Sequence, residues 1–519
     1  MIETDAGIAR SGRSAMWVGV GILASRLVGV ARNVVFAHYF GDSWIADAFT
    51  AALRLPNTTQ NLLGEGTLSA SFIPGYVQLR GRDPVQAATF ARDCLGLLLA
   101  TAAGISVLGA IFARPLTHVL VPGFAGDRLE LAVHLVRIFF PMTGILALSA
   151  WSLGVLNSHR KFLLPYLAPV VWSLAQIFAL VAGARFASGA RLAVILGYAA
   201  LCGAGLQLMV QLPSVRRLLG GSVVPRFARS TEEVKRAVRA LGPVVLGRGV
   251  VQISALVDTF LASLLPVGAN AVMGYVQAIY MFPVSLFGVG AAAAALPEMS
   301  SLVTDVEHGR RRLQAQTSES LTRVAFTTVP ATLAFLTLPD QIVGLLYQTG
   351  KFDALTTLAV AAPLAAAGTG LLANAGVRVL ASAFYALGDT STPARLAVIR
   401  VACSIGLSYA LMLRYGVVGL AAGSAIGGWL EAFLLAGRAR RRLGGLRLPA
   451  GRWGKILLSA VVAAAAGVAT KIALSGSELH LRAVGALASF GLAYLAVAWA
   501  LGLPDVRSPF AAVGRRLRK

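Results

Sequence analysis

Residues 91–113 read ARDCLGLLLATAAGISVLGAIFA. After Asp93 this stretch contains no charged residue, and it ends just before Arg114. A helix that crosses a bilayer needs about 20 mostly apolar residues, so the stretch predicts a membrane-spanning helix. The same criterion, applied outward along the chain, predicts an all-α polytopic membrane protein with about fourteen spans. They lie near residues 15–39, 44–78, 91–113, 130–157, 162–184, 192–214, 237–265, 269–302, 323–346, 355–386, 392–413, 416–437, 454–475 and 482–503.

The composition of the whole chain agrees with this fold class. Of 519 residues, 57% are hydrophobic and 13% are charged, which is about half the charged fraction of soluble domains. Together with a mean hydropathy of +0.73, these values exclude an ordinary soluble enzyme. The net charge of +24 does not indicate a nucleic-acid partner. Such proteins are polar with a basic face, whereas the basic residues here cluster between long apolar runs.

The basic residues also predict the topology. Alternate gaps between the predicted spans, counted with the adjoining span ends, hold about 31 of the 46 Lys and Arg residues, whereas the remaining gaps hold about 8. Because Lys and Arg concentrate in cytoplasmic loops, both termini are predicted to lie in the cytoplasm, with an even number of spans between them.

Seven arginines lie more than four residues inside a predicted span, and a charge at the bilayer centre costs roughly 3 kcal/mol or more. Arg137 and Arg400 lie near span ends, where snorkelling to the interface explains them equally well. The other five lie deeper and favour a polar interior: Arg26, Arg32, Arg54, Arg248 and Arg378.

The first two spans carry a polar constellation. On a helix, Arg26 and Arg32 point into one wedge and lie about 9 Å apart along the axis, with Asn33 close to the same face. Asp47 and Arg54 are seven residues apart and are predicted to share a face, before Pro56 breaks the helix. Polar residues follow, including Gln60, Asn61 and Glu65.

Guanidinium forks suit phosphate and diphosphate oxygens, so the constellation predicts a cationic, water-accessible cavity with acidic counter-charges. An internal Arg–Asp network that staples the two helices is the alternative.

No catalytic or metal-binding pattern is found in the sequence. The six histidines are scattered without ligand spacing, and the three cysteines lie far apart within apolar runs. A Walker-type phosphate loop is absent from the sequence. We therefore expect a transporter without a cofactor, driven by a monovalent ion gradient or by the membrane potential.

Ordered motifs along the chain resemble those of the MurJ (MviN) lipid II flippase family. The resemblance covers nearly the whole chain, and its motifs are specific when taken jointly. They include SRLVGVAR at 25–32, ADAF at 46–49, RLPN at 54–57, GEGTLSASFIP at 64–74 and FYALGDTSTP at 384–393.

The resemblance implies a member of the multidrug/oligosaccharidyl-lipid/polysaccharide (MOP) exporter superfamily with two pseudo-symmetric six-helix lobes, at 1–225 and 226–445. Two extra C-terminal helices, within 446–519, are expected to form a groove for a lipid tail. The implied activity is transfer of lipid II, undecaprenyl-diphosphate-linked MurNAc-pentapeptide-GlcNAc, from the inner to the outer leaflet of the bacterial cytoplasmic membrane by alternating access. Membrane lipids and cell-wall synthesis proteins are the further partners it implies.

The resemblance also assigns site residues. The family's cavity arginines match Arg26 and Arg32, its acidic position on the second helix matches Asp47, and a basic position in the tenth span matches Arg378. Further matches are Arg54, at a position where the family often has Lys or Arg, and Glu65.

Several positions depart from the family pattern. Gln60 and Asn61 occupy the positions of two family arginines. Asn33 occupies the position after the second arginine of the first helix, where the family often has Asp. Ala278 occupies a position where the family has an arginine. Arg248 is our candidate substitute for that last cation.

The family's sodium site also has a candidate residue here. Asp258 could supply the acidic group of the seventh span, but span 392–413 holds no Asp or Glu. Sodium coupling of the family's form is therefore not expected.

Two alternatives stay open from the sequence. The first is a MOP transporter for another polyprenyl-linked glycan, which the missing arginines allow. The second is a non-transporting membrane scaffold, for which internal ion pairs would suffice.

Overall fold

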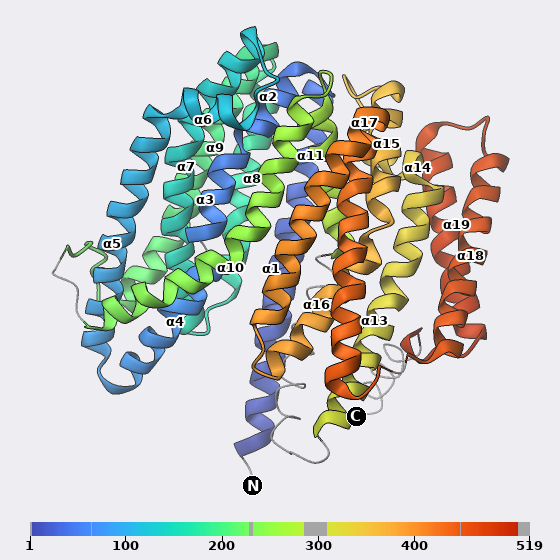
Figure 1. Ribbon diagram of the computed structural model, residues 1–519. Helices are drawn as coiled ribbons and strands as arrows, with labels where there is room; N and C mark the ends of the chain where they lie inside the picture. The colour runs from blue at the N-terminus through green and yellow to red at the C-terminus, as the bar shows by residue number, and fades with distance from the viewer. Residues whose placement is uncertain (1–2, 64, 228–231, 285–308, 447, 507–519) are drawn as a thin grey trace. The chain divides into compact units, whose positions relative to one another are not determined.

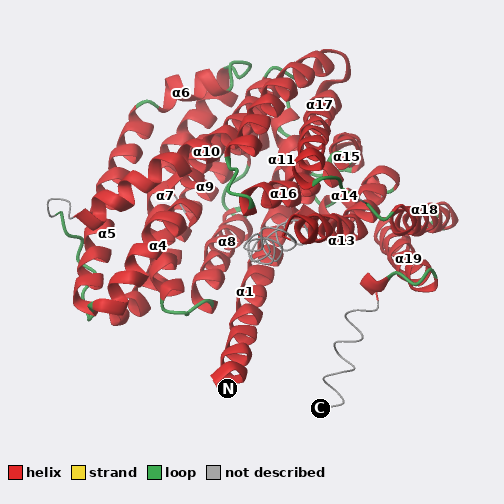
Figure 2. Cartoon of the chain, turned by 60° about the horizontal axis from the view of Figure 1, so that its bottom comes forward, coloured by secondary structure: helices red, strands yellow, loops and turns green. Residues whose placement is uncertain are grey.

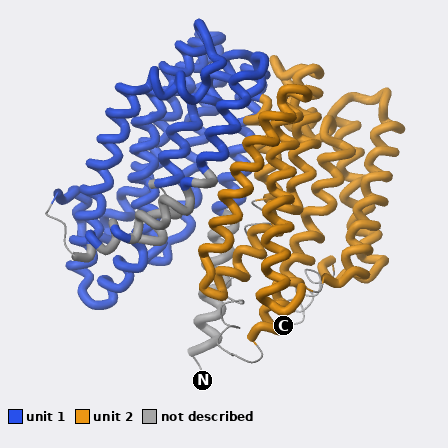
Figure 3. Tube along the Cα trace, viewed as in Figure 1, with its two compact units in different colours: residues 1–271 blue, residues 272–519 orange. Residues whose placement is uncertain are grey.

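The computed structural model describes residues 3–63, 65–227, 232–284, 309–446 and 448–506. Within these residues every regular element is an α-helix (Figures 1 and 2). The chain divides into two compact units, residues 1–271 and 272–519 (Figure 3). The division into six-helix lobes with a boundary at 225 stays a prediction.

Unit 1 is built from long helices with short breaks. They are α1 (Glu3–Phe40), α2 (Trp44–Ala52), α3 (Arg54–Leu63), α4 (Glu65–Arg82), α5 (Pro84–Ile111), α6 (Ala113–Leu120), α7 (Gly126–Ser158), α8 (Leu163–Gly183), α9 (Gly189–Leu218) and α10 (Glu232–Ser263). The stretch 91–113 forms most of α5, as predicted. Helix α11 (Ala269–Pro283) begins in unit 1 and continues into unit 2.

The second predicted span holds α2, α3 and α4, and residue 64, between α3 and α4, lies outside the described residues. A break falls at Leu53, before Arg54, although Pro56 predicted it just beyond that arginine. The reason is the hydrogen-bond ladder: Pro56 has no N–H to donate to the carbonyl of Ala52, four residues earlier. Asp47 and Arg54 therefore belong to separate helices.

Helix α7 lies at the centre of unit 1 and packs against α2, α4, α5, α8 and α9. One core cluster joins Phe72 of α4, Phe90 of α5 and Trp151 of α7, all nearly inaccessible to solvent. The indole Nε1 of Trp151 donates to the carbonyl of Ala91 at 3.1 Å. Because a buried indole N–H needs such an acceptor, this bond fixes α5 on α7.

In unit 2 the described residues form the rest of α11 and seven further helices. They are α13 (Gly309–Thr337), α14 (Pro339–Tyr347), α15 (Ala354–Gly368), α16 (Leu371–Ala386), α17 (Ser391–Leu443), α18 (Ala450–Ala473) and α19 (Leu479–Ala500). Helices α13 and α14 meet at a bend of 85° and together fill the predicted span 323–346.

Helix α17 contains two predicted spans joined at Gly416. The backbone of this residue has φ 56° and ψ −134°, which lie outside the helical region. Glycine adopts such positive φ values without steric cost. The two halves then pack closely: a Cβ at Gly423 would lie 2.4 Å from the Ser408 nitrogen, and one at Gly427 would lie 1.9 Å from the Ser404 hydroxyl. Small residues at four-residue spacing permit such an approach.

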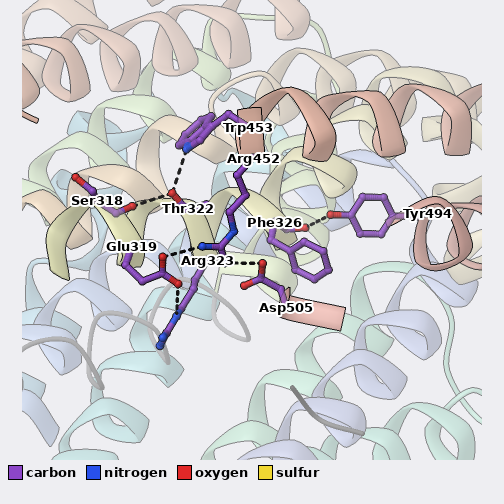
Figure 4. A network of polar contacts seen from close by, with 9 residues as sticks. All are labelled: Ser318, Glu319, Thr322, Arg323, Phe326, Arg452, Trp453, Tyr494 and Asp505. Carbon is purple, nitrogen blue, oxygen red and sulfur yellow. Dashed lines mark hydrogen bonds and ion pairs between the residues drawn. The ribbon is translucent and has the colours of Figure 1, made fainter. Parts of the chain in front are cut away.

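A polar network joins α18 to α13 within unit 2 (Figure 4). The two terminal nitrogens of Arg452 reach Glu319 and Asp505, each at 2.7 Å. Farther along α18, Lys471 pairs with Asp340 of α14 at 2.7 Å. These ion pairs hold the hairpin of α18 and α19, the two predicted C-terminal helices, against α13 and α14.

Eight described helices are long and apolar enough to cross a membrane, or nine if α13 and α14 form one span. This count takes α17 as one helix and α15 with α16 as one, and the predicted span 269–302 extends past the described residues. The multi-pass all-α class is therefore confirmed, and the number fourteen is consistent with the described helices but is not established by them.

Candidate functional site

The two arginines of α1 lie on an exposed part of that helix. Arg26 is exposed, and Arg32 is half-buried. The Arg32 guanidinium donates to Oδ1 of Asn33 at 3.0 Å and lies 4.9 Å from the ring centroid of Trp172 on α8. The Trp172 indole is itself held, because its Nε1 donates to the carbonyl of Ala200 at 2.9 Å. A chain of contacts from α9 through α8 therefore fixes the position of Arg32.

The face between these arginines is open. Gly29 lies midway between Arg26 and Arg32 along the helix, and no described atom lies within 4 Å of the position that a Cβ would occupy there. By contrast, a Cβ at Gly21 would lie 2.8 Å from Cβ of Tyr166. Helix α1 is therefore pressed against α8 at Gly21 and open at Gly29.

Asp47 lies elsewhere, in a fully buried position. Its carboxylate pairs with Arg128 of α7 and accepts the backbone N–H groups of Gly268 and Ala271 at 2.6 and 2.8 Å. Arg128 also stacks over the Phe124 ring at 3.6 Å. Asp47 thus joins α2, α7 and the first turn of α11. In this structure its described partners are groups of the protein, and its predicted role toward substrate stays a prediction.

Arg54 and Asp258 are brought together from α3 and α10, where they interact electrostatically. Close by in sequence, the Asn61 side-chain nitrogen donates to Oε1 of Gln252 on α10 at 3.3 Å, and Gln60 is half-buried. Gln60 and Asn61, which replace the family's arginine pair, are thus polar groups of α3 on the side that contacts α10. The ion-coupling role predicted for Asp258 stays a prediction.

Two predicted site residues lie outside the described side chains. Glu65 begins α4 and Arg248 lies in α10, but the orientation of neither side chain is described. Ala278, at the position of the missing arginine, is half-buried in α11.

Unit 2 carries its own polar group around Arg378, which is exposed on α16. The Asn374 amide, one turn earlier, donates to the Tyr280 hydroxyl at 2.7 Å. Both Arg378 and Arg400 interact electrostatically with Tyr280. Arg400 pairs with the buried carboxylate of Glu431 at 3.3 Å. Among the described residues Arg378 makes no ion pair.

Sequence reasoning missed the partners in this group. Arg400 was open to a snorkelling interpretation, and the structure instead pairs it with Glu431 on the second half of α17. A signal existed: Glu431 is the one acidic residue of the apolar run 416–437. Tyr280 carried no comparable signal, because an aromatic residue in a span is ordinary.

The helical arrangement defines the class of protein. A solved structure of the lipid II flippase MurJ in an inward closed conformation matches with a TM-score of 0.78, covering 93% of this chain and 98% of that one at 21% identity. An inward-facing multidrug resistance transporter of the MATE family, in the MOP superfamily, matches with a TM-score of 0.69 over 81% of this chain and 94% of that one at 19% identity. The fold is that of the MOP transporters.

Sequence comparison identifies the family. The lipid II flippase MurJ of Burkholderia cenocepacia is 30% identical over 92% of this chain and 95% of its own length. Probable lipid II flippases MurJ of Bdellovibrio bacteriovorus (30% identity, 95% of this chain and 94% of the relative) and Rhizobium tropici (34%, 80% and 79%) are similar at this level. The family described as lipid II flippase MurJ matches residues 36–490. This chain belongs to the lipid II flippase MurJ family.

Proposed function

We propose that this chain moves lipid II across a bacterial cytoplasmic membrane and binds its diphosphate between Arg26 and Arg32. Membership in the family supports the substrate. The observation that carries the site is the open face at Gly29, flanked by one exposed and one half-buried guanidinium. Guanidinium groups form charge-assisted, bidentate hydrogen bonds with phosphate oxygens, and two of them about 9 Å apart along a helix can grip the two ends of a diphosphate.

The two arginines have different parts in this proposal. Arg32 is fixed by Trp172 and Asn33, so it is preorganised and loses little side-chain freedom when it binds. Arg26 makes no ion pair among the described residues and is exposed, so it can close on the anion after Arg32 has positioned it. We assign Arg32 to positioning the headgroup and Arg26 to retaining it.

The remaining arginines differ in whether a carboxylate neutralises their charge. Arg54 faces Asp258 and Arg400 faces Glu431, so both already have a carboxylate. Arg378 has no ion pair within the described part of unit 2. We therefore propose that Arg378 is the cation of unit 2 that is available to an anionic group, and that Arg54 tunes the charge of its own site without gripping the substrate.

The lipid tail requires an apolar surface. The hairpin of α18 and α19 exposes Leu457, Leu458, Leu492 and Leu495, each at least half exposed. Ion pairs at both ends of α18 hold the hairpin in place. We propose that the polyprenyl chain lies along this hairpin while the headgroup crosses by alternating access. A monovalent ion gradient or the membrane potential would drive the cycle, with both termini in the cytoplasm.

Complementation tests this function. Cells depleted of their own flippase receive this gene with Arg26→Ala, Arg32→Ala or, as a matched control, Arg185→Ala, an exposed arginine after α8. We expect growth with the control and lysis with either α1 variant, at equal protein levels in the membrane. Growth of both α1 variants would overturn the assigned roles of the arginines. Failure of the wild-type gene to sustain growth would contradict lipid II transport itself.

A further inference from the structure

A cavity that contains several charged side chains lies in unit 1, at the N-terminal ends of three helices. Its volume is about 610 Å³, and it is lined by Trp44 at the start of α2, Asp127, Glu130, His134 and Arg137 along α7, and Ala190 at the start of α9. Helices α7 and α9 are both long and apolar enough to span the membrane. The ends of membrane-spanning helices lie near the boundary between hydrocarbon and water, so we infer that this cavity lies near that boundary.

The charged groups of the cavity are ordered along α7. Asp127 and Glu130 lie in its first turns, at the water side, and Arg137 lies seven residues beyond Glu130, or about 10 Å deeper by helical rise. Glu130 also pairs with Arg114. Asp127 and Arg137 are exposed and make no ion pair among the described residues. A carboxylate near the water and a guanidinium deeper in the membrane are thus both available to a ligand.

This order matches one class of lipid. In an ethanolamine phospholipid a flexible two-carbon linker lets the ammonium reach the water side of the phosphate, while the acyl chains run inward. A guanidinium at headgroup depth binds phosphate oxygens well, and an ammonium pairs with carboxylates. Trp44 adds an amphipathic ring of the kind that settles at the membrane interface. An anionic lipid without the ammonium would meet the carboxylate of Asp127 at a cost, whereas Glu130 is already paired with Arg114.

We propose that this cavity binds the headgroup of an ethanolamine phospholipid, with its phosphate on Arg137 and its ammonium on Asp127 and Glu130. The bound lipid would be a structural ligand of unit 1, separate from the transported substrate. The site does not include the arginines of α1, so this proposal is independent of the proposed transport function.

Photocrosslinking of the full chain in detergent micelles tests this site. The probes are photoactivatable phosphatidylethanolamine and photoactivatable phosphatidylglycerol, and the readout is the crosslink yield on residues 126–137 by peptide mass spectrometry. For the wild-type chain we expect a yield at least threefold higher with phosphatidylethanolamine. An equal or lower yield would overturn the proposal, and so would displacement of the probe by a polyprenyl diphosphate but not by unlabelled phosphatidylethanolamine.

Three variants sharpen the test. Arg137→Gln should lower the yield with both lipids about fivefold. Asp127→Asn combined with Glu130→Gln should abolish the preference between the lipids without lowering the yield with phosphatidylglycerol. Arg185→Gln, at the same end of unit 1, should change neither. Because the replaced side chains are exposed, their loss leaves the core intact, and unchanged thermal midpoints would verify this. Wild-type yields from Arg137→Gln, or a retained preference in the double variant, would refute the assignment.

Discussion

The guanidinium of Arg32 lies 4.9 Å from the ring centroid of Trp172, a cation–π contact between α1 and α8. Contacts of this kind contribute about 0.5–1 kcal/mol when exposed and about 2 kcal/mol when desolvated. In the proposed function, the contact preorganises Arg32 for a diphosphate.

The first prediction concerns this contact. Trp172→Leu should weaken binding of labelled lipid II about threefold to tenfold, because Arg32 loses the ring that holds it. Trp172→Phe keeps an aromatic face, so its loss of binding free energy should be less than half of the loss in Trp172→Leu. Equal losses in the two variants, measured with the protein in nanodiscs, would show that the indole N–H bond to Ala200 matters and the ring face does not.

The second prediction uses the open space at Gly29. Gly29→Leu should fill the gap between Arg26 and Arg32 while leaving both charges in place, so transport should fall at least tenfold without loss of folded protein. Gly104→Leu is the matched control, since a Cβ at Gly104 also meets no described atom within 4 Å. Initial rates of lipid II transfer in vesicles compare the two variants. Normal transport by Gly29→Leu would place the diphosphate elsewhere.

The third prediction concerns the buried pair of Asp47 and Arg128. Asp47→Asn leaves the Arg128 charge without its carboxylate, which should cost about 3–5 kcal/mol of stability. Adding Arg128→Met removes the uncompensated charge and should recover part of the loss. Arg185→Gln, which removes an exposed charge of the same unit, should have little effect. Additive losses in a double-mutant cycle, measured by denaturant unfolding in detergent, would show that the pair is not coupled.

A fourth prediction concerns pH. His159 lies between α7 and α8, with Nε2 2.9 Å from the Tyr76 hydroxyl. Partial burial, with the positive charges of Arg80 and Lys161, lowers the pKa of His159 below 6.5. The folded state therefore binds fewer protons than the unfolded state in this range. The neutral His159 ring therefore contributes fully to the stability of the folded state above pH 6.5. This contribution is lost as the pH falls from 6.5 through the lower pKa that His159 has in the folded state.

The matching measurement is the thermal midpoint between pH 8 and pH 5 for the wild type and for His159→Gln. Replacement of the imidazole should flatten the fall of the midpoint below pH 6.5, since glutamine does not titrate. Parallel curves for the two proteins would show that other groups cause the pH dependence.

Much of the fold could be predicted from hydropathy, because span length is imposed by the bilayer. Runs such as 91–113 and 482–503 each correspond to a described helix. The breaks were harder to place. Pro56 signalled a break, but the missing hydrogen bond moved it to the N-terminal side of Arg54. The break between the predicted spans 392–413 and 416–437 is present, and the structure reduces it to one non-helical residue, Gly416, within α17.

The site was predictable where one helix sufficed. Arg26, Gly29 and Arg32 share a face of α1 by periodicity alone, and the structure leaves the gap at Gly29 open. Partners distant in sequence could not be found this way. The contact of Arg32 with Trp172, the pair of Asp47 with Arg128, and the pair of Arg400 with Glu431 all depend on packing between helices.

The most direct test of the central claim is transfer of fluorescent lipid II across sealed vesicles that contain the purified chain. The wild type and Arg185→Ala should transfer the lipid at equal rates, and Arg26→Ala combined with Arg32→Ala should not exceed protein-free vesicles. Transfer by that double variant at the wild-type rate would contradict the claim that these two arginines hold the diphosphate.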